Sequence, residues 1–271
     1  MIHFFRILAI GVVAMVTGCT CNGIPSSMPE KTEGGRRIAY AAYTSEPVEN
    51  NGKLNESAWQ RAPRYYLSRP LKWDGYYSSL SAEEKAKYGD DVLEKAYLQM
   101  LYDGENLYLG FTLEDFDIKA AGVRDQEMHF ILGDLIEVFI KPDFADYYWE
   151  LYSTPKEHKT ALEFFARRSG IEGNDKLQLD FTVSSAINGT LNDSDDADKG
   201  WSTIVTIPFK SLSKHGDAFC GNGTWTLLIG RYNYLAEDEY AKEELTAFPQ
   251  ITEVDFHSLS EYAAIVFLPE N

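Results

Sequence analysis

The stretch 96–113, AYLQMLYDGENLYLGFTL, constrains the fold more than any other part of the chain. Apolar residues alternate with other residues on both sides of Asp103-Gly104, a dipeptide that is strongly preferred in two-residue hairpin turns. After the turn, every second residue is large and apolar, and the residues in this register are Leu107, Leu109, Phe111 and Leu113. Because side chains alternate between the two faces of a strand, this pattern predicts a β-hairpin with one buried face.

Similar short runs fill most of the remaining chain. They lie at 134–142, 146–154, 161–168, 176–187, 201–209, 224–235 and 262–268. Many short strands separated by Gly, Asn and Asp predict an all-β fold, an antiparallel β-sandwich of jelly-roll or immunoglobulin-like type. Two short surface helices are expected, one in 81–91 with Ser81 as its N-cap and one in 55–62 capped by Asn55 or Ser57.

The N-terminus has the pattern of an export signal. Arg6 precedes the apolar run ILAIGVVAMV, which is too short to span a bilayer, and Val16-Thr17-Gly18-Cys19 follows it. This tetrapeptide resembles the lipobox of bacterial lipoproteins. We therefore expect a signal peptide over 1–18, a lipidated Cys19 beginning a flexible stalk over 19–37, and one folded domain over 38–271. The expected location is the cell envelope, at the periplasmic face or the outer-membrane surface.

Charge limits the partners. The chain has 25 basic and 42 acidic residues, and removal of Arg6 with the signal leaves 24 − 42 = −18. So acidic a protein is repelled by phosphate backbones, which argues against nucleic acid as a partner. The sequence leaves two interpretations of Cys220 open, a disulfide with Cys21 in the stalk or a small buried hydrophobe.

Five motifs occur in an order that resembles the family 9 carbohydrate-binding modules. They are Asn51-Gly-Lys-Leu-Asn-Glu-x-x-Trp59, the run 101–109, the run 134–140, Gly200-Trp with Ile207-Pro-Phe209, and the closing strands with IGRYNY and DFHSLSEYAAIVF. The resemblance covers about 48–268. It implies a β-sandwich that binds sugars without catalysis, often with structural calcium, and that acts beside glycoside hydrolases or as a separate exported protein.

The resemblance also implies site residues. Glu137 matches a glutamate that hydrogen-bonds sugar hydroxyls, and alternation places it on the face opposite Ile136 and Val138. Phe256, followed by His257, matches one of two aromatic rings that enclose the sugar. The other ring matches Ile131, with Phe130 next to it.

Further polar contacts are implied for three strand residues, Arg231, Asn233 and Glu150. Arg and Glu suit this task because they bridge neighbouring hydroxyls in a bidentate manner.

Other aromatic and acidic residues are weighed against simple packing or solvation. Trp59, Trp201 and Trp225 are expected in the core. Trp73, in the loop-like run PLKWDGYYSS, is a candidate sugar platform. Asp115 and Asp117 match a place where the family sometimes binds metal, and the acidic loop 192–201 lacks the ligand spacing of an EF-hand.

The expected function is noncatalytic capture of oligo- or polysaccharide by a lipid-anchored protein, in support of glycan degradation with a neighbouring glycoside hydrolase. The alternatives are a haem-binding sandwich that uses Met128-His129, an adhesion or scaffold lipoprotein with a degenerate pocket, and a glycan-processing enzyme. The sequence contains no G-x-S-x-G or H-E-x-x-H motif, and its many carboxylates make any single acid/base pair uninformative.

Overall fold

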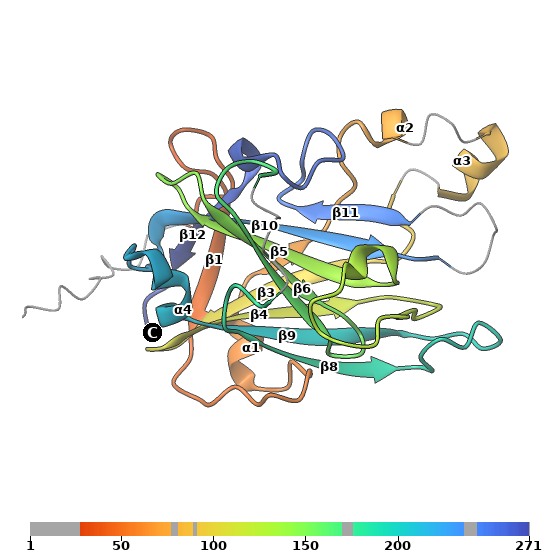
Figure 1. The fold of residues 1–271 in the computed structure, drawn as a ribbon, viewed down its shortest axis with the longest axis horizontal. Coiled ribbons are helices and arrows are strands. Elements are labelled where there is room, and N and C mark those ends of the chain that lie inside the picture. The colour runs from red at the N-terminus through yellow and green to blue at the C-terminus, as the bar shows by residue number, and fades with distance from the viewer. Residues whose placement is uncertain (1–27, 77–80, 89–90, 170–175, 236–242, 271) are drawn as a thin grey trace, which may run out of the picture.

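A computed structural model of the chain describes residues 28–76, 81–88, 91–169, 176–235 and 243–270. Within them, twelve strands form one continuous sheet (Figure 1). The strands are β1 Ile38–Tyr43, β2 Arg64–Tyr66, β3 Ala96–Tyr102, β4 Asn106–Leu113, β5 Leu135–Pro142, β6 Tyr148–Ser153, β7 Lys159–Phe164, β8 Thr182–Asn188, β9 Gly200–Pro208, β10 Asn222–Asn233, β11 Glu244–Phe248 and β12 Ala263–Phe267. The short helices are α1 Ser57–Arg61, α2 Trp73–Tyr76, α3 Ala82–Tyr88 and α4 Phe209–Leu212, with 3-10 turns η1 His129–Ile131, η2 Ser213–His215 and η3 Leu259–Glu261.

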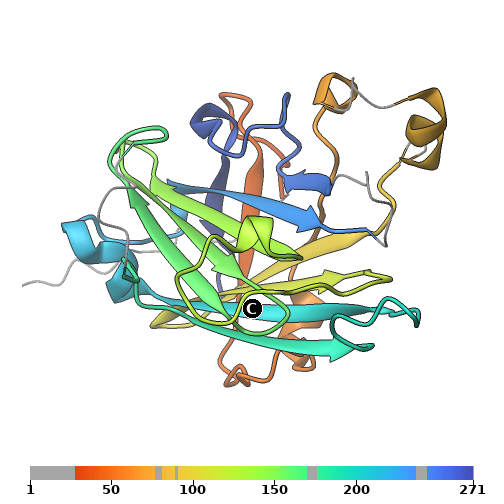
Figure 2. The ribbon, with the colours of Figure 1, turned by 45° about the vertical axis from the view of Figure 1, so that its right-hand side comes forward.

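The sheet folds over on itself into two layers. The strand order is β7-β6-β5-β10-β12-β1-β3-β4-β9-β8, with β11 beside β10 and β2 beside β3. Strand β1 joins the layers, since its first residues pair with β12 and its last two pair with β3. Both of these pairings are parallel, whereas the other strand pairs are antiparallel. In Figure 2 the green strands β5, β6 and β7 of one layer lie in front of the yellow and cyan strands of the other layer and cross them at an angle. The predicted all-β sandwich is confirmed.

The main core fills the space between the layers. Strands β3 and β4 form the predicted hairpin, in which Tyr102 pairs with Leu107. Leu107, Leu109, Phe111 and Leu113 face this core and are at most 2% exposed. From the opposite layer, Ile136, Val138, Ile140, Trp149, Trp225, Leu227 and Ile229 meet them. At roughly 1.5–3 kcal/mol for each fully buried large apolar side chain, this core is the dominant stabilising feature.

A second apolar cluster lies on the outer face of β5, β6 and β10. The segment 249–262 crosses this face and buries Ile251, Phe256 and Tyr262 against Phe139 and Leu228. The face that alternation assigns to the side away from the core is therefore covered as well. Glu137 lies on this face and is only 3% exposed, which a two-layer sandwich alone would not predict.

Trp59 packs, as expected. Its ring is 2% exposed and lies over Gly110, where an added Cβ would come within 2.7 Å of the ring. Helix α1 begins at Ser57, but the N-cap is Glu56 rather than Asn55 or Ser57, and no side chain caps the helix. The Glu56 carboxylate accepts instead from Trp59 Nε1 at 3.0 Å, which fixes the ring of Trp59.

The second predicted helix is α3, which begins directly after Ser81. Residues 28–37, which the sequence assigns to the stalk, turn back on themselves through a bridge between Lys31 and Arg37. The signal peptide, Cys19 and Cys21 lie outside the described residues, so the proposed lipidation and the Cys21–Cys220 pairing stay predictions. Cys220 is buried. No helix in the described ranges is long and apolar enough to cross a membrane.

Candidate functional site

A hollow of about 190 Å³ opens on the outer face of β5, β6 and β10, at the edge of segment 249–262. Its lining comes from all three strands, from η1, from the turn after β7 and from segment 249–262. The lining residues are Phe130, Glu137, Glu150, Tyr152, Arg168, Tyr232, Val254, Asp255, Phe256 and His257. Five of the predicted site residues, Phe130, Glu137, Glu150, Phe256 and His257, are therefore brought together in one place.

Strand register places Glu137 beside Phe256. Glu137 lies opposite Gly230 on β10 and opposite Tyr152 on β6. An added Cβ at Gly230 would lie 2.6 Å from the ring of Phe256, so only glycine lets this ring cross the strand so closely. Because Gly230 has no side chain, the ring of Phe256 can lie next to the buried carboxylate of Glu137.

Glu137 and Glu150 form a pair of buried carboxylates on the floor of the hollow. The Tyr152 hydroxyl donates to Glu150 Oε1 at 2.5 Å. Burial and the nearby charge of Glu150 raise the pKa of Glu137 well above its usual value. Burial also raises the pKa of Glu150, to about 7. The pair therefore holds a proton over much of the neutral range, as two close carboxylates in a low-dielectric site do.

His257 is held by a chain of hydrogen bonds. The backbone N–H of Arg168 donates to the Tyr148 hydroxyl at 3.0 Å, and this hydroxyl lies 2.7 Å from His257 Nδ1. Because burial lowers the pKa of His257 to about 4, the ring is neutral. The Tyr148 hydroxyl then donates its hydrogen bond to Nδ1. The ring proton of the neutral imidazole is therefore on Nε2, which points toward Glu150 Oε2 at 3.7 Å.

The rim of the hollow carries an ion-pair cluster. Asp255 accepts from Arg168 Nη2 at 2.8 Å and also pairs with Arg167. Arg167 Nε donates to the His257 backbone oxygen at 3.1 Å. Both arginine side chains are 54% exposed, so their main role is to fasten the turn after β7 to segment 249–262 at the mouth of the hollow.

Three aromatic rings form one wall. Tyr232 lies between Phe130 and Phe256, with ring centroids 5.9 Å and 5.8 Å away respectively. Tyr232, Tyr152, Arg168 and Asp255 are lining residues that the sequence reasoning missed. Tyr152 and Tyr232 follow Glu150 and Gly230 by two residues, so the period of a strand would have placed them on this face.

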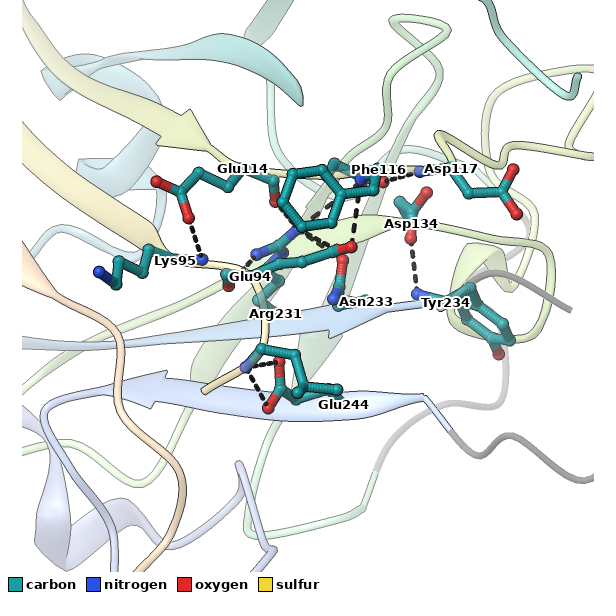
Figure 3. Close-up of polar contacts among 12 residues, drawn as sticks. Glu94, Lys95, Glu114, Phe116, Asp117, Asp134, Arg231, Asn233, Tyr234 and Glu244 are labelled. Carbon is teal, nitrogen blue, oxygen red and sulfur yellow. Dashed lines mark hydrogen bonds and ion pairs between the residues drawn. The ribbon is translucent and has the colours of Figure 1, made fainter. Parts of the chain in front are cut away.

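Arg231 and Asn233 lie elsewhere, on the core side of β10, where both are 0% exposed. Figure 3 shows the Arg231 guanidinium between Glu94 and Glu114. It donates to the Glu94 and Glu114 backbone oxygens at 2.8 Å and 2.6 Å and to Asn233 Oδ1 at 2.5 Å.

Two carboxylates complete this buried cluster around Arg231. Glu94 Oε2 lies 3.8 Å and Asp115 Oδ2 lies 3.6 Å from Arg231 Nη2. Burial and the charge of Asp115 raise the pKa of Glu94 to about 7. The structure thus corrects the predicted placement, because Arg231 lies opposite Ile136 rather than Glu137. Its side chain therefore points into the sandwich.

The structure gives Asp115 and Asp117 partners from the chain itself. Asp115 accepts from Trp201 Nε1 at 3.1 Å, and Asp117 pairs with Lys119 Nζ at 2.9 Å. Ser194 also donates to Asp117. Among the residues described, no group of three or more His, Cys, Asp or Glu is arranged to hold a metal ion. These two aspartates do not fit a calcium site, because arginine, lysine and tryptophan already occupy their oxygens.

Trp73 and His129 also lie outside the hollow. Trp73 stacks under the Arg69 guanidinium, 4.5 Å from the ring centroid. Its segment supports segment 249–262 through Leu71 N–H to Ile251 O and Lys72 N–H to Thr252 O, both at 2.8 Å. His129, the ligand of the haem alternative, is 2% exposed and stacks on His158. The space beside His129 leaves no room for a water molecule, so haem would require this segment to rearrange.

Comparison with known proteins places the fold. No protein-family model and no curated protein sequence matches the chain. A solved structure of a putative carbohydrate-binding protein from Bacteroides uniformis has a TM-score of 0.59 at 12% identity, over 85% of this chain and 98% of that one.

Two structures of a family 9 carbohydrate-binding module from Caldicellulosiruptor kristjanssonii also match. The complex with cellotriose has a TM-score of 0.54 at 15% identity, over 87% of this chain and 95% of that one. The complex with glucose has a TM-score of 0.52 at 12% identity, over 87% and 97%. The chain therefore has the fold of family 9 carbohydrate-binding modules, as the sequence motifs predicted.

Proposed function

We propose that this protein binds oligo- or polysaccharide without catalysis, and that the hollow around Glu137 is its binding site. The observation that carries the proposal is the meeting of two buried carboxylates with an aromatic wall in one small hollow. The shared fold supports it, because proteins with this fold are described as carbohydrate-binding or were solved with cellotriose or glucose.

The chemistry of the lining suits a sugar. An aromatic ring covers the C–H face of a pyranose, and Phe256, Tyr232 and Phe130 offer such rings along one wall. Glu137 and Glu150 accept hydrogen bonds from hydroxyl groups, and each charged acceptor is worth roughly 1.5–3 kcal/mol. At about 190 Å³ the hollow is smaller than the roughly 300–1,000 Å³ of common ligand pockets, so it takes one sugar unit or a chain end.

The test is a glycan array with the purified chain, followed by calorimetry on the best ligand. Any soluble fragment should begin no later than residue 28, because β1 joins the two layers and its first residue, Ile38, donates to the Glu30 backbone oxygen at 2.9 Å. Glu137→Gln and Phe256→Leu should each weaken binding about tenfold or more. The proposal fails if no saccharide binds at millimolar concentration, or if both variants bind as well as the natural chain.

A paired-carboxylate site is also the arrangement that glycosidases use, so the same preparation should be assayed for new reducing ends. Release of reducing sugar that Glu137→Gln and Glu150→Gln abolish would make the protein a glycan-processing enzyme. Binding without turnover supports the noncatalytic role.

We further propose that Cys19 is lipidated and holds the domain at the cell envelope, where it serves a neighbouring glycoside hydrolase. Support comes from the lipobox-like tetrapeptide that ends at Cys19 and from the apolar run before it. Partition into a detergent phase should be lost in Cys19→Ala. If this variant partitions as the natural chain does, the anchor is wrong, whereas the sugar-binding proposal is unaffected.

A further inference from the structure

The floor of the hollow holds two buried carboxylates that share a proton, and so keeps one negative charge near neutral pH. Glu137 and Glu150 are 3% and 4% exposed and repel each other across the hollow. Among the described residues, the ion pair recorded for Glu150 is the one with His257, and His257 is neutral because burial lowers its pKa to about 4. Within the described part of the chain, the two carboxylates thus share a low-dielectric site in which neither is paired with a charged cation at neutral pH, and Arg168 acts on Glu150 only from beyond ion-pair distance.

Hydrogen bonds do not fill this need. The hydroxyl of Tyr152 has one proton to offer, and it goes to Glu150 Oε1. Glu150 Oε2 is buried and has no hydrogen-bond partner among the residues described. A buried polar atom without a partner costs about 1–3 kcal/mol, and more for a charged group. A binding site that leaves a carboxylate oxygen unpaired next to its opening is prepared for a donor that the ligand brings.

The nearest cations do not supply this donor. Arg168 lines the hollow, but its guanidinium pairs with Asp255 at 2.8 Å and its side chain is half-exposed at the rim. Arg167 also pairs with Asp255. The rim thus has two arginines for one aspartate, but among the described residues neither arginine donates a hydrogen bond to Glu137 or Glu150, and the charge of Arg168 acts on Glu150 only from a distance.

We propose that the hollow prefers a sugar unit with a positively charged amino group, and that Glu150 Oε2 and Glu137 receive its ammonium. The inference rests on the proposed sugar-binding function and adds the class of sugar. An ammonium group offers three donors and a full charge, whereas a hydroxyl offers one donor and no charge. As the cation enters, the proton that the two carboxylates share leaves to solvent, so binding releases up to one proton.

The proposed test compares glucosamine trimers with N-acetylglucosamine trimers of the same linkage, by calorimetry on the full chain near pH 6.5. The acetylated trimer keeps the ring and linkage but loses the charge. We expect the cationic trimer to bind at least tenfold more tightly and to release a proton, measured as a difference in heat between two buffers of unlike ionisation enthalpy. The groups facing the carboxylate pair, namely Tyr148, Tyr152, Arg168, Tyr232, Asp255, His257 and Tyr262, are unchanged in this comparison.

Variants locate the effect. Glu150→Gln should reduce the tenfold preference to less than threefold, although the affinity for both trimers falls because Glu150 also accepts from sugar hydroxyls. Glu163→Gln is the matched control, because Glu163 is equally buried on the neighbouring strand β7 but pairs with Lys214 outside the hollow. If Glu150→Gln does not fold, Glu137→Gln serves the same purpose, and the comparison of ligands on the natural chain stands by itself.

Each outcome decides. Equal affinity for the two trimers, or tighter binding of the acetylated one, overturns this inference and leaves the proposed function intact. Tighter binding of an acidic sugar such as a glucuronate oligomer also overturns it and points to the rim arginines. Failure of every sugar to bind removes the proposed function itself.

Discussion

Gly230 and Phe256 are in contact in a way that no other residue at position 230 would allow, since an added Cβ would lie 2.6 Å from two ring atoms of Phe256. Gly230 also lies opposite Glu137 in the register of β5 and β10. The glycine therefore determines how near an aromatic ring comes to the carboxylate floor, although its own backbone makes only ordinary sheet hydrogen bonds.

Gly230→Ala is expected to displace Phe256 and so to weaken sugar binding. Adding a methyl group to a packed site costs about 1–3 kcal/mol of stability, and the ring must also leave its place beside Glu137. We expect at least a fivefold loss of affinity, measured by calorimetry, together with a lower melting temperature.

Gly110→Ala is the matched control for this prediction. An added Cβ there would lie 2.7 Å from the ring of Trp59, on the other layer and outside the hollow. It should lower the melting temperature in a similar way and leave affinity within twofold. Equal loss of affinity in both variants would mean that general destabilisation, and not the position of Phe256, controls binding.

Arg231→Met should mainly destabilise the fold. The substitution leaves the Glu94 and Glu114 backbone oxygens without their donor and Asp115 without its cation. Breaking a buried ion pair from one side costs about 3–5 kcal/mol. Urea unfolding should show a loss of this size, while sugar affinity measured on the folded protein stays within twofold.

Arg64→Met is the control for Arg231→Met, because Arg64 stacks on Tyr97 at the surface and should contribute less than about 1 kcal/mol. A large loss of affinity in Arg231→Met with little change in stability would restore the placement that the sequence first indicated for Arg231.

The difference between Arg231 and Glu137 shows how far the sequence alone reaches. Alternation within one strand correctly assigns Glu137 to the side away from Ile136 and Val138. The same alternation places Arg231 on the core side of its strand with Leu227 and Ile229, so its predicted place in the site came from the family resemblance and not from the strand pattern. The hairpin 96–113 was predictable because its turn residues fix the register locally.

The covering of Glu137 was not predictable for a related reason. Segment 249–262 has no regular period, and its path over β10 depends on distant contacts such as Leu71 N–H to Ile251 O. Phe256 and His257 entered the site only through resemblance to a family. Arg168 had no signal in the sequence, because its place at the rim depends on the ion pair with Asp255.

Tyr148→Phe should alter the protonation of His257. Without the hydroxyl, Nδ1 loses the hydrogen bond that orients the ring and that adds to burial in opposing its protonation. The loss of one hydrogen bond should cost about 1 kcal/mol of stability, and sugar affinity should fall several-fold as the ring turns away from Glu150. An NMR titration of His257 in both proteins checks the cause: its pKa should rise from about 4 toward the ordinary value in Tyr148→Phe. An unchanged titration would show that burial alone keeps this ring neutral.

Glu94→Gln should make stability less dependent on pH. The pKa of Glu94 is raised to about 7 in the folded protein, chiefly by burial and by the charge of Asp115, from an ordinary value near 4.5. A carboxyl with a raised pKa is favoured in its protonated form on folding, so its contribution is complete below about pH 4.5 and is lost as pH rises through 7. The shift corresponds to roughly 3 kcal/mol.

Urea unfolding at pH 5 and pH 8 checks this prediction. The free energy of unfolding should differ less between the two pH values in Glu94→Gln than in the natural chain. Glu114→Gln, at an exposed neighbouring carboxylate whose oxygen accepts from Lys95 N–H, should keep the natural difference. An equal pH dependence in all three proteins would mean that Asp134, whose pKa is also raised by burial, or another buried carboxyl controls it instead.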